Sequence, residues 1–125
     1  MKYKTFEEMP IWIEAVRAAK VIYEITGCSK WSKEFSLKDQ IRRAAYSVSS
    51  NIAEGFEYDN LNDFVRFLRI AKGSLGEVKS QLYLAEKLGF IGKEEFEKGY
   101  NTIGPLGKQL GGFIKYLKQY KDNKE

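Results

Sequence analysis

The segment QIRRAAYSVSSNIAEG, residues 40–55, decides the fold of this chain. Apolar residues recur at Leu37, Ile41, Val48 and Ile52, and this spacing places them on one face of a helix. Alanine, serine and asparagine fill the positions beside that face, and such small side chains let a second helix approach closely. Their polar groups need hydrogen-bond partners where they are buried. The segment therefore predicts a helix that packs tightly inside a helical assembly.

The composition is that of one globular domain spanning residues 1–125. The chain is 43% hydrophobic and 30% charged, which is ordinary for a protein with a packed core. A lone Cys28 cannot form an intramolecular disulfide and suits a reducing compartment. The N-terminus has no apolar signal segment and no stretch approaches a membrane span, so we expect a cytoplasmic protein that does not enter the membrane. A net charge of +4, with the excess in the second half, leaves room for an anionic partner.

Hydrophobic periodicity predicts four helices, at approximately 10–26, 37–54, 61–88 and 93–118. The third has the most regular pattern, with apolar residues alternating at spacings of three and four, as in the seam of a left-handed bundle. The connections are short relative to the helices, and no alternating strand pattern competes. The predicted fold class is all-α, an antiparallel up-down-up-down four-helix bundle.

Glycines and capping residues predict where the first three helices begin and end. Gly27 is expected to end the first helix in the left-handed conformation. Ser36 is expected to cap the second helix, and Gly55 to end it. The third helix is expected to be capped by Asn60 or Asn62 and to end at Gly89.

Three further expectations concern the connections and the fourth helix. Trp31 and Phe35, in the connection after the first helix, are expected to fold onto the core. Pro105 removes a backbone hydrogen bond, so a kink or short break is expected near residues 101–105. The tail after Lys118 is expected to fray.

The sequence contains no catalytic apparatus that we recognise. There is no histidine, which excludes histidine-based nucleophile activation, acid–base catalysis and metal ligation. Cys28 therefore has no histidine partner and is interpreted as a small hydrophobic residue. Gly73 and Gly76 match neither a Walker nor a dinucleotide-binding motif, and we interpret them as positions of close helix packing. We predict no catalytic residue and no cofactor.

Four carboxylates cluster around the second turn: Glu54, Glu57, Asp59 and Asp63. Such a group could hold magnesium in a nuclease, because magnesium prefers oxygen ligands. Helix capping and a solvated loop explain the same residues, and we favour that reading, so no metal site is expected. Glu54 directly follows an apolar face and could pair with an arginine of another helix, including Arg42 or Arg43 of a second subunit.

Basic side chains on the second and third helices are the candidates for binding nucleic acid. Phosphate contacts of this kind are salt-sensitive and largely independent of base sequence. A solvated helix face is the alternative explanation of the same residues. The residues we predict for phosphate contact are Arg42, Arg43, Arg66, Arg69 and Lys72.

Several segments, in the same order, resemble a family of four-helix bundles encoded in intervening sequences of bacterial 23S ribosomal RNA genes. The segments are residues 40–45, 50–55, 64–77, 81–85 and 88–91. The resemblance implies a ring-like homopentamer with no enzymatic activity. It also implies a relationship to the accessory protein of diversity-generating retroelements, which binds a reverse transcriptase and nucleic acid. Ser49, where the family usually has proline, and Pro105 depart from the family pattern.

Two functional hypotheses follow from the residues and the resemblance together. The first is a non-enzymatic homo-oligomer, expected to be a pentamer, that acts as an accessory module bound to RNA, DNA or a ribonucleoprotein, with a reverse transcriptase as a partner by analogy. The second is a scaffold that binds only protein. In both, Asn51, Glu54 and Gly55 are predicted to serve packing, hydrogen bonding and assembly.

Overall fold

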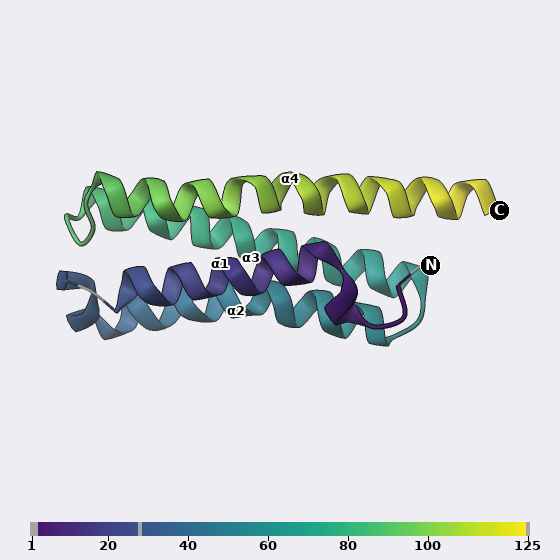
Figure 1. Ribbon diagram of the computed structural model, residues 1–125, viewed down its shortest axis with the longest axis horizontal. Helices are drawn as coiled ribbons and strands as arrows, with labels where there is room; N and C mark the ends of the chain where they lie inside the picture. Colours follow the sequence, from purple (N-terminus) through teal and green to yellow (C-terminus); the bar gives the residue numbers. More distant parts are fainter. Residues whose placement is uncertain (1–2, 28, 125) are drawn as a thin grey trace.

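The chain folds into four antiparallel α-helices, and the computed structural model describes residues 3–27 and 29–124. The helices are α1 (Pro10–Thr26), α2 (Phe35–Glu57), α3 (Leu61–Lys87) and α4 (Lys93–Lys124). Two short 3-10 helices, η1 (Phe6–Glu8) and η2 (Ser29–Lys33), precede α1 and α2. The helices run up, down, up and down along one long axis (Figure 1). The predicted all-α bundle is confirmed.

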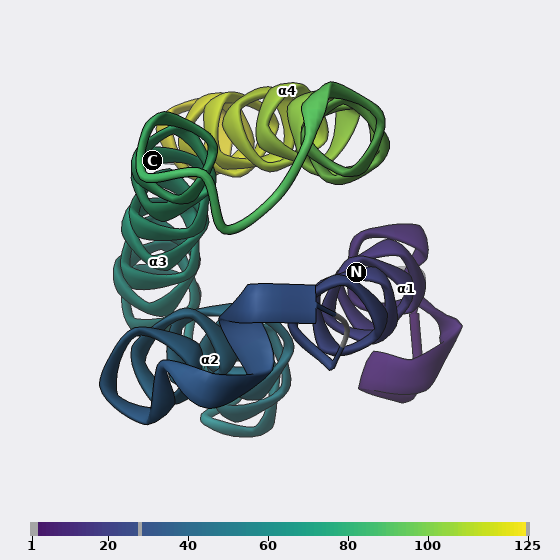
Figure 2. The ribbon, with the colours of Figure 1, turned by 90° about the vertical axis from the view of Figure 1, so that its left-hand side faces the viewer.

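The four helices lie at the corners of a square when the bundle is seen from its end (Figure 2). Each helix packs on its two neighbours in sequence order, and α4 closes the bundle against α1. Side chains that bury almost all of their surface run along the centre. They include Met9, Ile22, Trp31, Ile41, Ile52, Leu68, Leu82, Leu106, Leu110 and Leu117.

The boundaries of α1 and α3 follow from local signals. Pro10 occupies the first turn of α1, where the missing N–H costs nothing. The side chain of Asn60 accepts a hydrogen bond from the backbone N–H of Asp63 at 3.0 Å and so caps α3. At the other end of α3, Gly89 takes the left-handed conformation, with φ of 78°.

The predicted end of α2 at Gly55 is wrong, because the helix continues to Glu57. Gly55 is buried within α2 and lies against α3. A Cβ built on it would lie 2.6 Å from the Cβ of Phe67 and 3.1 Å from Cδ1 of Phe64. The glycine therefore serves the close approach of two helices and not the end of one.

The expectations for the turn between α1 and α2 need three corrections. Gly27 has φ of −81° and so lies in the right-handed region. Ser36 lies inside α2, which begins at Phe35 after Glu34, and Glu34 makes no side-chain cap. Trp31 is buried as expected, but Phe35 is 73% exposed beneath the ammonium of Lys38. The buried Trp31 holds η2 on the core. Only Glu34 separates η2 from α2, and the side chain of Phe35 at the start of α2 points to solvent. Cys28 lies outside the described residues.

The predicted break in α4 is also wrong, since Pro105 lies inside a helix that continues to Lys124 (Figure 1). The residue before a proline normally avoids the helical region because its Cβ meets the proline ring, and Gly104 has no Cβ. Pro105 is exposed, while Ile103 and Leu106 beside it are buried and hold the helix on the core. The same helix extends past Lys118, beyond which the tail is expected to fray.

Candidate interaction surfaces

Arg42 connects α2 to the C-terminal end of α1. Its Nε donates a hydrogen bond of 2.8 Å to Oγ1 of Thr26, and its Nη2 donates one of 3.2 Å to the carbonyl of Tyr23. The guanidinium also lies over the ring of Tyr23, with Cζ 4.3 Å from the ring centroid. The last carbonyls of a helix and its dipole both favour a cation. Because Arg42 supplies a donor to the last turn of α1, this helix end does not need Gly27 in the left-handed conformation.

Arg43 and Arg66 are both exposed, and each is paired within its own helix. Nε of Arg43 donates to Asp39 at 2.8 Å, and this hydrogen bond, together with the carboxylate charge, raises the pKa of Arg43. Arg66 lies 3.5 Å from the carboxylate of Asp63 and over the ring of Phe67. Exposed pairs of this kind leave the guanidinium accessible to a competing phosphate.

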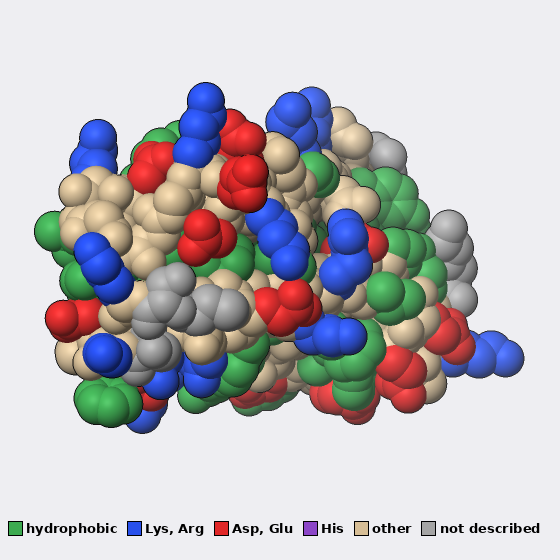
Figure 3. All heavy atoms as spheres, turned by 60° about the vertical axis from the view of Figure 1, so that its left-hand side comes forward, with side chains coloured by type: hydrophobic (Ala, Val, Ile, Leu, Met, Phe, Trp, Pro, Cys, Tyr) green, Lys and Arg blue, Asp and Glu red, His purple; other side chains and the backbone are tan. Residues whose placement is uncertain are grey.

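The predicted arginines do not form one patch. Oγ of Ser47 and Oγ of Ser74 lie 3.0 Å apart, which sets the antiparallel register of α2 against α3. Arg43 therefore lies level with residue 78 of α3, about 18 Å along the bundle from Arg66. Figure 3 shows the face that carries the turn between α1 and α2, where Lys and Arg side chains alternate with Asp and Glu.

A shallow groove between α3 and α4 gathers lysines that the sequence scatters. It has a volume of about 570 Å³, and its charged lining residues are Lys72, Lys79 and Lys108. Backbone of Gly76, Gly104, Gly107, Gly111 and Gly112 forms much of its floor. We call this the lysine groove. Of the residues predicted for phosphate contact, only Lys72 lines it, and Arg69 is exposed on α3 outside its lining.

Lys79 and Lys108 complete the groove, and the sequence held a signal for the second of them. Gly104, Lys108 and Gly112 follow one another at a spacing of four and so share a face of α4. Gly76 faces open space, as does Gly73 nearby, since a Cβ on either would meet no atom within 4 Å. The expectation that these two glycines allow close packing is therefore not met within the chain.

The residues predicted for assembly lie along the contact between α2 and α3. Nδ2 of Asn51 donates to the carbonyl of Ser47 at 2.8 Å and contacts its Oγ at 2.9 Å. Ser47 in turn reaches Ser74, so a polar chain crosses from one helix to the next. Glu54 is exposed on α2. No hydrogen bond or ion pair of Glu54 occurs among the described residues.

Comparison with known proteins places this arrangement in a family. A model of the 23S rRNA-intervening sequence protein family matches residues 7–112. The chain belongs to that family. A crystal structure of a protein of unknown function from the S23 ribosomal protein family of Bacteroides thetaiotaomicron is similar, with 27% identity and a TM-score of 0.76 over 84% of this chain and 98% of the other. No curated protein matches the chain.

This member of the 23S rRNA-intervening sequence protein family also carries an aromatic cavity, at the end of the bundle where α2 turns into α3. The cavity has a volume of about 290 Å³. Tyr3, Tyr116 and Tyr120 line it but lie outside the residues that the family model matches. The sequence alone could not reveal this cavity, because its lining comes from the N-terminal segment and from α2, α3 and α4.

The described part of this family member holds neither a metal-binding cluster nor a helix that could span a membrane. Among residues 3–27 and 29–124, no group of three or more cysteine, aspartate or glutamate side chains is arranged to hold a metal ion. The carboxylates near the second turn are therefore not gathered into such a group in this part of the chain. Within the same residues, every helix is too short or too polar to cross a bilayer.

Proposed function

We propose that this member of the 23S rRNA-intervening sequence protein family is a non-catalytic accessory module that binds the phosphate backbone of RNA or DNA through its lysine groove. The observation that carries the proposal is the charge of that groove. Lys72, Lys79 and Lys108 are its charged lining residues, and no acidic side chain lines it. A surface of one sign of charge attracts a polyanion and holds it without reading its bases.

The shape of the groove supports the same function. Glycines on its floor leave the surface open, so a sugar–phosphate backbone can lie between the lysines without meeting bulky side chains. Nζ of Lys79 lies 5.2 Å from the ring centroid of Tyr100, which keeps the ammonium over the groove. Arg42, by contrast, is already engaged at the end of α1, so we expect it to contribute to stability and not to binding.

A titration of labelled structured RNA and duplex DNA, read by fluorescence anisotropy, tests the proposal. Three lysine–phosphate contacts imply that affinity for duplex DNA falls about 40-fold between 50 and 200 mM salt. Replacing Lys72, Lys79 and Lys108 by glutamine should abolish most of this binding and its salt dependence. Replacing Lys20, Lys30 and Lys87, which do not line the groove, changes the net charge equally and should leave most of it. Equal losses in the two triple variants would contradict the proposal.

We further propose that the module works as a homo-oligomer, with the pentamer as the expected state. Support comes from the solvent side of α3, where Ile70 and Leu84 are 43% and 44% exposed, and from Leu88 directly after the helix, which is 53% exposed. Large apolar side chains that share an outward helix face are typical of a contact surface. Sedimentation equilibrium at micromolar concentration tests this, and a monomer there would refute it.

The same apolar face supports a second candidate function, a scaffold that binds another protein and no nucleic acid. A reverse transcriptase is one partner that the resemblance suggests. An absence of RNA and DNA binding at low salt, with the fold intact, would favour this scaffold over the accessory module.

A further inference from the structure

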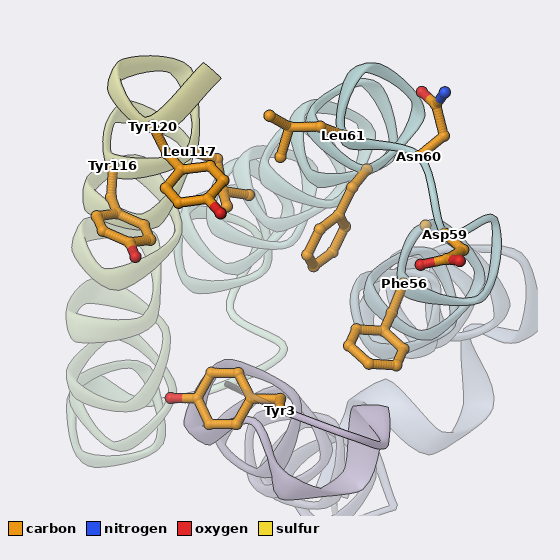
Figure 4. A pocket seen from close by; sticks show the side chains of 10 residues that line it. Tyr3, Phe56, Asp59, Asn60, Leu61, Tyr116, Leu117 and Tyr120 are labelled. Carbon is orange, nitrogen blue, oxygen red and sulfur yellow. The ribbon is translucent and has the colours of Figure 1, made fainter. Parts of the chain in front are cut away.

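Half of the residues that line the aromatic cavity at the end of the bundle carry aromatic rings: Tyr3, Phe56, Phe64, Tyr116 and Tyr120. Figure 4 shows Tyr116 and Tyr120 on one side, Phe56 on the opposite side and Tyr3 below. These rings come from α4, α2 and the N-terminal segment, so the walls of the cavity form only when the bundle closes.

Contacts between rings hold these walls in place. Phe56 packs edge-on to Phe64, with centroids 6.0 Å apart, and Phe64 packs edge-on to Phe113 at 5.8 Å. Phe113 stacks on Tyr116 at 6.1 Å, and Tyr116 lies 6.3 Å from Tyr120. This chain of contacts leads from α2 through α3 to α4. The faces of aromatic rings carry partial negative charge, so rings fixed around one space favour a cation within it.

The charged side chain of the cavity is negative, so it favours a cation, as the faces of aromatic rings do. Asp59 is its charged lining residue, and Figure 4 shows the carboxylate at the turn after α2, near the backbone end of the Phe56 side chain. Asp59 has φ of 52°, a left-handed conformation that is rare outside glycine, asparagine and aspartate. The turn thus holds an acid at a position where few other side chains are accepted.

The helix ends at the cavity reinforce this preference. α2 ends beside it, at Glu57, and the C-terminal end of a helix dipole favours positive charge. α3 begins at the same place, but its first-turn N–H of Asp63 is already bonded to Asn60. The unfavourable end of that dipole is therefore partly compensated by the protein itself.

The geometry points to a binding site for a small organic cation, with an alkylammonium or guanidinium head group seated among Phe56, Tyr116 and Tyr120 and paired with Asp59. The volume of about 290 Å³ lies at the small end of the range for ligand pockets, which suits a head group and not a larger molecule. This inference does not rest on nucleic-acid binding, which is proposed for a separate set of residues further along α3 and α4.

Titrations of the full chain with choline, n-butylammonium and ethylguanidinium, followed by NMR shifts of the tyrosine rings, test the site at constant ionic strength. The control ligand is 3,3-dimethyl-1-butanol, which has the shape of choline without its charge. We expect saturable shifts with a cation and at least about tenfold weaker binding of the neutral compound. Tightest binding of choline would indicate a free quaternary ammonium ligand, and tightest binding of butylammonium or ethylguanidinium a lysine or arginine side chain of a partner.

Two variants with matched controls separate charge from ring. Asp59→Asn keeps a residue that accepts the left-handed conformation and should weaken cation binding about threefold to fivefold. Tyr116→Leu keeps apolar bulk but loses the ring, and should weaken binding about threefold to tenfold, whereas Tyr116→Phe should bind nearly as the parent. Circular dichroism confirms that each variant is folded. Equal binding of choline and its neutral analogue, no saturable shift with any cation, or unchanged affinity in both Asp59→Asn and Tyr116→Leu would overturn the inference.

Discussion

Replacing Gly55 by alanine should destabilise the bundle, because the added methyl group has no space. The new Cβ would lie 2.6 Å from the Cβ of Phe67, whereas two carbon atoms pack best at about 3.5–4.0 Å. Cβ of Phe67 is fixed to the α3 backbone and cannot rotate away. α2 and α3 must therefore move apart by about 1 Å, and the packing they lose includes the buried Phe64 beside the same glycine.

The magnitude follows from two opposing effects. Overpacking of a core costs about 1–3 kcal/mol. Alanine in a helix interior is better than glycine by about 0.5–1 kcal/mol, which offsets part of this cost. We expect a net loss of about 1–2 kcal/mol in the free energy of unfolding. Gly73→Ala is the matched control, because Gly73 also lies within a helix and its Cβ would meet no atom within 4 Å. It should gain about 0.5–1 kcal/mol.

Urea denaturation of both variants, followed by circular dichroism at a fixed protein concentration, measures the difference. Both substitutions remove the same backbone freedom from the unfolded chain, so the gap between them isolates the contact with Phe67. We expect a gap of about 1.5–3 kcal/mol, with an unchanged dependence on urea. If Gly55→Ala is as stable as Gly73→Ala, then α2 and α3 are not held at this distance.

Three further substitutions test other contacts by the same denaturation assay. Arg42→Ala should destabilise the protein by about 1–3 kcal/mol, because it removes the donor to the hydroxyl of Thr26 and one of the donors to the carbonyl of Tyr23, and unchanged stability would contradict this role. Pro105→Ala should stabilise α4 by about 1–3 kcal/mol, since it restores a backbone hydrogen bond inside the helix, and a loss of stability would show that the proline fits better than its position suggests. Asp59→Gly should gain up to about 1 kcal/mol by relieving its left-handed conformation, and a clear loss would mean that its carboxylate stabilises the turn.

The sequence predicts those parts of the fold that depend on local signals. Pro10 and Asn60 act within one turn of their own position, so the starts of α1 and α3 agree with the structure. The role of Gly55 in α2 depends on Phe67, which lies in another helix, and the continuity of α4 at Pro105 depends on burial beside it. Such contacts are set by packing between helices, which periodicity does not specify.

The candidate surfaces were predictable only in part for the same reason. Clusters of basic residues can be read from the sequence, and Lys72 does line the lysine groove. Whether Arg42 faces solvent or the end of α1 depends on how the two helices are aligned, which the sequence of one helix does not state. The aromatic cavity is still harder to predict from the sequence, because Tyr3 and Tyr116 line the same space only in the folded bundle.

The polar chain from Asn51 through Ser47 to Ser74 has a consequence for how the helices choose their alignment. Hydrophobic seams repeat, so α2 could slide along α3 by one turn, about 5.4 Å, and still bury apolar surface. In that shifted bundle the partly buried Ser47 and Ser74 would no longer meet, and the lost hydrogen bond would cost about 0.5–1.5 kcal/mol. The hydrogen bond between the two hydroxyls thus adds little to the stability of the observed bundle, but it favours this register of α2 and α3 over registers shifted by one turn.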